Sequence, residues 1–218
     1  MGIDIEMEFE KKGILIVVSA PSGSGKGTVL SHLTEDREHF ALSVSLTTRK
    51  PRTGEIDGIH YFFVSKEDFL KEIENGNMLE YAEYCGNYYG TPKDRVDELL
   101  SNGINVILEI ETVGAMKIKK LCPDAIFIMI LPPSFSALEK RLRSRGTNSE
   151  EDIQKRLETA VKELSCIEMY DYVVINRDGK SKEAADTITG IAMAEKCRVK
   201  RNPELISDFY DTKPDNEK

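Results

Sequence analysis

Paired cysteines, a membrane-length apolar run and an excess of positive charge are all lacking in this sequence of 218 residues. The four cysteines, at positions 85, 122, 166 and 197, form no C-x-x-C pair, so the sequence indicates neither a zinc site nor a disulfide framework. No apolar stretch approaches the roughly 20 residues that a membrane helix needs. The acidic start also lacks the apolar region of a signal peptide. We therefore expect a cytoplasmic protein with reduced thiols.

The formal net charge is −8, which argues against a general nucleic-acid binder and against a membrane-surface protein. A small anionic ligand remains compatible with this charge, because local lysines, arginines and backbone amides can hold it whatever the total charge. The length suits one buried domain or one domain with an inserted lobe. The sequence leaves open whether the protein is a monomer or a homodimer.

Four short apolar runs, at 14–18, 105–111, 125–131 and 172–176, have the composition of buried parallel strands. Helical patterns lie between them, and strands that alternate with helices predict an α/β fold with a doubly wound parallel sheet. Two helices are expected to bury one face each, formed by Phe135, Leu138 and Leu142 and by Ile153, Leu157, Val161 and Leu164.

Residues 44–92 break this alternation and predict an inserted, small β-rich lobe. Ser65 and Asp68 resemble a capping box that opens a helix, and Asn75-Gly76 ends it. Two short strands are expected around Gly86-Asn87, and Thr91-Pro92 opens a helix that Asn102-Gly103 closes. The polar tail after about Val199 is expected to be frayed.

The stretch SAPSGSGKGT, residues 19–28, stands between the first apolar run and a helical pattern. A strand that turns abruptly into a helix presents free backbone N–H groups, and glycines let that backbone wrap a phosphate. Lys26 adds a mobile positive charge. The sequence predicts a phosphate-binding loop, and a plain tight turn is the less favoured alternative. The loop comprises Ala20, Pro21, Ser22, Gly23, Ser24, Gly25, Lys26, Gly27 and Thr28.

This loop departs from the usual pattern G-x-x-x-x-G-K-[ST] at two positions, Ala20 and Gly27. The hydroxyl that would contact a metal is missing at Gly27, and Thr28 brings one a residue later. Mg²⁺ bound with the phosphates would then depend on water, phosphate oxygens and a carboxylate, for which Glu109 is the candidate through a water molecule.

A second anion site is indicated by Arg49 and Arg52, which stand three residues apart in a polar turn. Two guanidinium groups suit a monophosphate dianion, and Tyr61 and Tyr89 could donate to the same phosphate. Taken singly, each of these residues is better explained as a solvated charge or a core tyrosine.

Five stretches occur in an order and at spacings that resemble the guanylate kinase family: VSAPSGSGKGT, SVSLTTRKPRTGEIDGIHY, LEYAEYCGNYYGT, LEIETVGA and RLRSRGTNSEEDIQKRL. The resemblance covers residues 13–197 and leaves a 1–12 extension and a polar 198–218 tail. It implies a three-part P-loop kinase that transfers the γ-phosphoryl group of ATP to GMP. The parts are a core (13–43, 93–137 and 157–197), a GMP-binding lobe (44–92) and a helical lid (138–156).

The resemblance also assigns roles to individual residues. It implies that Arg49, Arg52, Tyr61 and Tyr89 bind the GMP phosphate, and that Ser45, Glu80, Thr91 and Glu111 surround the guanine. The carboxylate of Glu80 could accept both the N1–H and the 2-amino group of guanine, whereas adenine offers an acceptor at N1 and would be rejected. The resemblance also implies which side chains are the catalytic cations: Lys26, Arg49, Arg141, Arg145 and Arg156. Glu109 and Glu111 depart from the family, since many relatives carry aspartates there, and Val113 stands where a glutamine is common.

Two alternatives stay open at this point. One is a kinase of the same superfamily that acts on AMP or another monophosphate. The other is a non-enzymatic module of the same fold that binds phosphorylated peptides, which the intact glycine loop and Lys26 disfavour.

Overall fold

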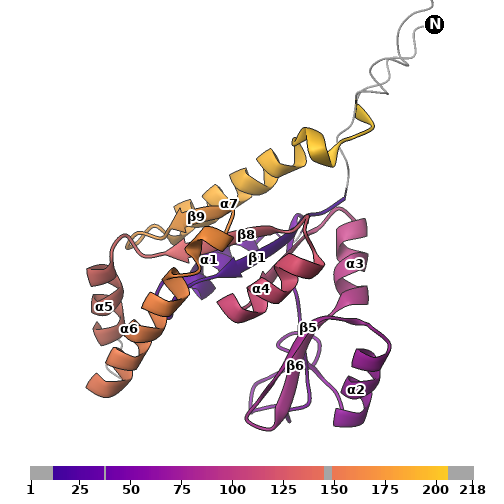
Figure 1. Cartoon of the computed structure of the whole chain (residues 1–218), viewed down its shortest axis with the longest axis horizontal. Helices are drawn as coiled ribbons and strands as arrows, with labels where there is room; N and C mark the ends of the chain where they lie inside the picture. Colours follow the sequence, from indigo (N-terminus) through magenta and orange to yellow (C-terminus); the bar gives the residue numbers. More distant parts are fainter. Residues whose placement is uncertain (1–11, 37, 145–148, 206–218) are drawn as a thin grey trace, which may run out of the picture.

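A parallel five-stranded sheet forms the centre of this computed structural model, which describes residues 12–36, 38–144 and 149–205 (Figure 1). The strand order is β2-β7-β1-β8-β9, and every neighbouring pair is parallel. This confirms the α/β class and the doubly wound sheet. The strands are β1 (Leu15–Ser19), β2 (Phe40–Leu42), β7 (Asn105–Glu109), β8 (Ile126–Leu131) and β9 (Tyr172–Ile175).

Helices cover both faces of the sheet. The central strands are apolar at successive positions rather than at alternate ones, so side chains on both faces need to be buried. Ile14, Ile16 and Val18 pack toward α1 (Lys26–Leu33) and α7 (Ser181–Lys196). The intervening Leu15 and Val17 join the opposite cluster. The helices on that second face are α3 (Lys93–Ser101) and α4 (Thr112–Leu121).

Two details of the sheet differ from the expectation. The predicted strand 105–111 ends at Glu109 as β7, and Glu111 is already the N-cap of α4, so its side chain lies beyond the sheet. The edge strand β2 was not expected, because three residues are too few to show a strand period.

The predicted lobe forms a separate sheet of order β4-β3-β6-β5. Its elements are β3 (Leu46–Thr47), β4 (Phe62–Phe63), α2 (Lys66–Glu74), β5 (Met78–Tyr84) and β6 (Asn87–Pro92). Ser65 is the N-cap of α2 as predicted, since the Asp68 backbone N–H donates to Ser65 Oγ at 3.0 Å, and the Asp68 carboxylate accepts from the Ser65 hydroxyl at 2.7 Å. The predicted hairpin is confirmed too, with Cys85 and Gly86 at its turn in the left-handed region, at φ of 50° and 75°.

An arm of two helices, α5 (Phe135–Ser144) and α6 (Glu150–Leu164), projects from the sheet on the same side as the lobe (Figure 1). Leu138, Leu142, Ile153 and Leu157 pack together between the helices as expected. Phe135 and Val161 were expected on the buried faces of these helices, but they are 45% and 56% exposed. Each buried face is therefore narrower than predicted. The proposed boundary between lid and core at 156/157 falls inside α6.

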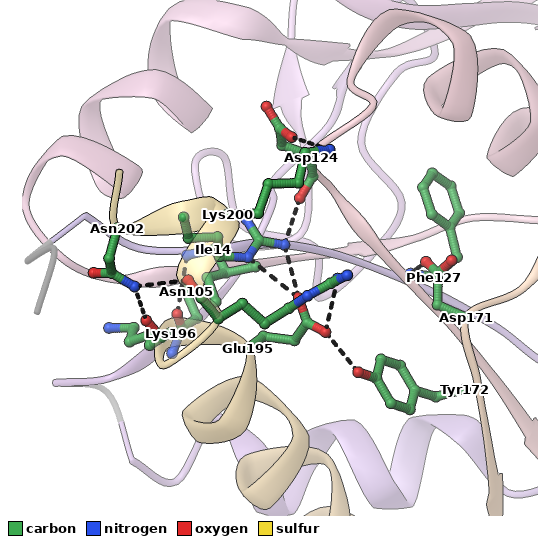
Figure 2. Close-up of polar contacts among 12 residues, drawn as sticks. Ile14, Asn105, Asp124, Phe127, Asp171, Tyr172, Glu195, Lys196, Lys200 and Asn202 are labelled. Atoms are coloured by element: carbon green, nitrogen blue, oxygen red, sulfur yellow. Dashed lines mark hydrogen bonds and ion pairs between the residues drawn. The ribbon is translucent and has the colours of Figure 1, made fainter. Parts of the chain in front are cut away.

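The residues after Val199 were expected to be frayed, and the described ones are held in place instead. Arg201 donates to Glu195 Oε2 at 3.0 Å and to the Asp124 carbonyl at 2.7 Å. Glu195 is 2% exposed and also accepts a hydrogen bond from the Tyr172 hydroxyl (Figure 2). Asn202 caps the end of α7 by donating to the Lys196 carbonyl (Figure 2). A buried carboxylate needs such partners, so this cluster ties residues 199–202 to the core.

Candidate functional site

The predicted phosphate loop connects β1 to α1 and lies at the carboxyl end of the central strand. Gly23 and Gly25 have φ of +97° and +81°, values at which a side chain would be strained. A Cβ on Gly25 would also lie 2.5 Å from Asn176 Nδ2. Gly25 is the N-cap of α1 and offers no side-chain acceptor, so the first amides of the helix are left for an anion.

Lys26 opens α1 and forms an ion pair with Glu109, with 3.3 Å between Nζ and Oε1. The two side chains are 20% and 44% exposed, so both can reach solvent or a ligand. The geometry brings together the predicted phosphate lysine and the predicted metal-side carboxylate. A bound polyphosphate would compete with Glu109 for the lysine.

The arm contacts the loop through two of the predicted arginines. Arg156 on α6 donates to Ser22 Oγ at 2.6 Å. Arg141 on α5 donates to the Ser24 carbonyl at 3.2 Å and to the Asn176 carbonyl at 2.8 Å, and pairs with Asp178 at 2.6 Å. Arg145 lies outside the described residues.

On the lobe, the structure brings Arg49, Tyr61 and Tyr89 together. The guanidinium of Arg49 lies 5.5 Å from the centroid of the Tyr61 ring, and the rings of Tyr61 and Tyr89 are 6.0 Å apart in an edge-on arrangement. Arg52 is exposed, and its backbone N–H donates to Glu55 Oε2 at 2.7 Å. The same carboxylate pairs with Arg49, which links the two arginines. Three of the four residues expected at a monophosphate site, Arg49, Tyr61 and Tyr89, therefore lie close together on the lobe.

Glu80 and Thr91 face one another across the β5–β6 hairpin, with the Thr91 hydroxyl donating to Glu80 Oε1 at 3.0 Å. Thr91 is buried and Glu80 is partly buried. Burial raises the pKa of Glu80, while the Thr91 hydrogen bond and the ammonium of Lys117 act in the opposite direction. Of the other residues expected near guanine, Ser45 is half-buried beside β3, and Glu111 is exposed at the start of α4.

Sequence reasoning missed several residues at these two sites. Glu55 accepts hydrogen bonds from the Arg49 guanidinium and from the Arg52 backbone N–H. The sequence could have indicated this role, because Glu55 is an acidic residue in the same turn, in the stretch TGE. Asn176 donates to the Ser24 carbonyl at 2.8 Å from the end of β9, where a parallel sheet places ligand-facing residues. On α6, burial and the charge of Glu111 raise the pKa of Glu163, whereas the charge of Lys26 lowers it.

No group of three or more histidine, cysteine, aspartate or glutamate side chains that could hold a metal occurs within residues 12–36, 38–144 and 149–205. Across the same ranges, no helix combines the length and the apolar character needed to span a membrane. The four cysteines are free thiols.

Comparisons with known proteins all point to the same family. The model of the guanylate kinase family matches residues 12–186. A guanylate kinase of Clostridioides difficile (strain 630) is 50% identical over 202 residues, which is 93% of this chain and 98% of that protein. A guanylate kinase of Desulfitobacterium hafniense (strain Y51) is 50% identical over 197 residues, covering 90% and 98%. The crystal structure of guanylate kinase from Anaplasma phagocytophilum aligns with a TM-score of 0.65 at 33% identity, covering 89% of this chain and 92% of that one.

Proposed function

Because this chain belongs to the guanylate kinase family, we propose that its two anion sites divide the substrates of one phosphotransfer between them. The protein is an enzyme that transfers the γ-phosphoryl group of ATP to GMP, giving ADP and GDP. The loop of residues 20–28 holds ATP, and the lobe of residues 44–92 holds GMP. The observation that carries this division is the gathering of Arg49, Tyr61 and Tyr89 on a lobe separate from Lys26.

On the ATP side, the amides at the start of α1 and the Lys26 ammonium act on the phosphates. Lys26 exchanges its ion pair with Glu109 for the phosphate oxygens. On the arm, Arg141 and Arg156 already contact the loop at Ser24 and Ser22, and together with Arg145 they act on the phosphoryl group in transfer.

On the GMP side, Arg49 and Arg52 hold the phosphate, with Tyr61 and Tyr89 as further donors. Glu80 accepts from the two donors of guanine, and Ser45, Thr91 and Glu111 complete the base site. The bond from Thr91 fixes the Glu80 carboxylate before guanine arrives. AMP would present an acceptor to this carboxylate, so the site disfavours it.

Mg²⁺ accompanies ATP in this proposal. The carboxylate of Glu109 forms an ion pair with Lys26, so it lies close to where the phosphates would bind. From there it could contact Mg²⁺ through a water molecule. Mg²⁺ commonly retains several waters, and this suits a chain whose described residues offer no cage of carboxylates. Bound with ATP, the ion would neutralise charge between neighbouring phosphates.

Catalysis then requires positioning and charge neutralisation, with no covalent enzyme intermediate. The lobe (44–92) and the lid (138–156) close on the core (13–43, 93–137 and 157–197), which excludes water and limits hydrolysis of ATP. The reduced thiols and the dependence on ATP support a cytoplasmic location.

A coupled assay with ATP and a panel of monophosphates, with and without Mg²⁺, tests the proposal. We expect rapid ADP formation with GMP and Mg²⁺, little with AMP, and a loss of turnover without the metal. Equal rates with AMP, or no turnover with GMP despite measurable ATP binding, would contradict it. The second of these results would favour a phosphopeptide-binding module.

A further inference from the structure

Lys117 connects the core to the lobe at the proposed guanine site. It lies on α4, and its Nζ donates to the backbone carbonyl of Tyr81 on β5 at 3.4 Å. Tyr81 directly follows Glu80, so the ammonium of a core helix is placed one residue from the proposed guanine acceptor. The side chain of Lys117 is exposed, so replacing it should not disturb the packed core.

The surroundings of Glu80 make a nearby positive charge consequential. From β6 the Thr91 hydroxyl donates to the carboxylate. From α4 the Lys117 ammonium, bonded to the carbonyl of the next residue, acts on it through its charge. On β5 itself the neighbouring titratable groups are Tyr81 and Glu83, and adjacent side chains of a strand point to opposite faces. Burial disfavours the charged form of Glu80, and Thr91 and Lys117 favour it.

We propose that Lys117 is a positioning residue for guanine recognition, which holds β5 against α4 and places a positive charge beside the Glu80 carboxylate. The inference rests on the proposed role of Glu80. An ionised carboxylate accepts from both guanine donors, whereas a protonated one presents an O–H to them and loses part of that recognition. Lys117 therefore extends guanine binding toward lower pH.

The first test measures Glu80 directly in the ligand-free protein, by following its side-chain carboxyl with ¹³C NMR across a pH titration. The signal is assigned by its loss in Glu80→Gln. We expect Lys117→Gln to raise the midpoint of the Glu80 titration by about 0.5 pH unit, since a neighbouring charge is lost. Lys117→Arg should restore the wild-type midpoint. The exposed Lys120→Gln on the same helix is the matched control and should leave it unchanged.

The second test follows kcat/KM for GMP between pH 5 and 8. The fall in kcat/KM on the acid side should begin at higher pH in Lys117→Gln than in the wild type and in Lys117→Arg, with KM for ATP unchanged. Unfolding temperatures at pH 8 check that all variants are folded.

A Glu80 titration that is identical in Lys117→Gln and the wild type would overturn the inference. So would a shifted titration with an unshifted GMP profile. In that second case, a Glu80→Gln enzyme that still uses GMP would show that the proposed role of Glu80 is wrong. A Glu80→Gln enzyme that cannot use GMP would show that the role of Glu80 holds and the role of Lys117 is wrong.

Discussion

Arg49 and Glu55 form a two-point ion pair in the turn of the lobe, with 2.9 Å between Nη1 and Oε2 and 2.8 Å between Nη2 and Oε1. The side chains are only 15% and 18% exposed. Glu55 also accepts the Arg52 backbone N–H at 2.7 Å. One carboxylate therefore fixes both the proposed phosphate arginine and the turn that carries the second one.

Replacing Glu55 by glutamine should raise KM for GMP by about tenfold, because Arg49 loses the charge-assisted bonds that orient it. The measurement is a GMP titration at saturating ATP, and KM for ATP should not change. Glu67→Gln is the control, since Glu67 is exposed and pairs with Lys71 within α2. An unchanged or lower KM for GMP in Glu55→Gln would show that Glu55 does not prepare the site.

The same pair should make stability depend on pH. Hydrogen bonds from Arg49 and Arg52 lower the pKa of Glu55 from 4.5 to about 2. A group whose pKa is lowered by folding stabilises the protein above its unfolded value and loses that contribution as the pH falls. The free energy of unfolding should therefore differ between wild type and Glu55→Gln at pH 6, and the difference should shrink between pH 4.5 and pH 2. Urea unfolding at several pH values measures it, and a constant difference would contradict the assignment.

Lys26→Met should reduce kcat by about a thousandfold, because a positive charge aimed at the phosphates is removed from a site built for charge neutralisation. The variant should keep its fold, since the ion pair of Lys26 with Glu109 joins two partly exposed side chains at the rim of the sheet. The exposed Lys93→Met serves as the control. Turnover like that of the wild type in Lys26→Met would remove this residue from the ATP site.

Glu80→Gln should lower kcat/KM for GMP by roughly a hundredfold or more, since an amide places a donor where guanine needs an acceptor. ATP binding, measured by calorimetry, should survive because the loop is untouched. Glu83→Gln on the same strand is the matched control, as its side chain is exposed. Unchanged GMP kinetics in Glu80→Gln would refute the proposed base site.

Glu195→Ala should lower the free energy of unfolding by about 3 kcal/mol, because Arg201 would lose its buried partner. Burial alone would raise the pKa of Glu195, but hydrogen bonds from Tyr172, Arg201 and Arg198 together lower it. Chemical denaturation provides the measurement, and kcat/KM for GMP in the folded variant should stay at the wild-type level. Glu183→Ala, on the same helix but exposed, should change stability little. Equal stabilities of the two variants would contradict the structural role.

Much of the fold could be predicted because its signals are local. The apolar runs of β1 and β8, the Ser65 cap and the Gly86 turn each depend on a few neighbouring residues. The strand β2 has three residues and draws its stability from pairing with β7, which lies more than sixty residues away in the chain. Burial of Asn202 and Glu195 depends on contacts between the tail, β9 and α7, and polar composition alone suggested the opposite.

The candidate site was predictable where a motif carries its own chemistry. Lys26 and the glycine loop were found from order and spacing, and Arg49 and Glu80 from charge and the pattern of the family. Asn176 and Lys117 were not, because each acts through a backbone carbonyl of a segment distant in sequence. Such contacts leave no periodicity and no motif, so only the folded chain reveals them.

Arg141 is anchored at three points, the Ser24 carbonyl, the Asn176 carbonyl and the Asp178 carboxylate. A swing of the arm that carries Arg141 away must break these bonds, one of which is accepted by the backbone of the nucleotide loop. Ionic strength weakens the exposed Arg141–Asp178 pair first, since that carboxylate is 73% exposed. The rate at which the arm opens should therefore increase with salt, and product departure would accelerate with it if arm opening limits turnover.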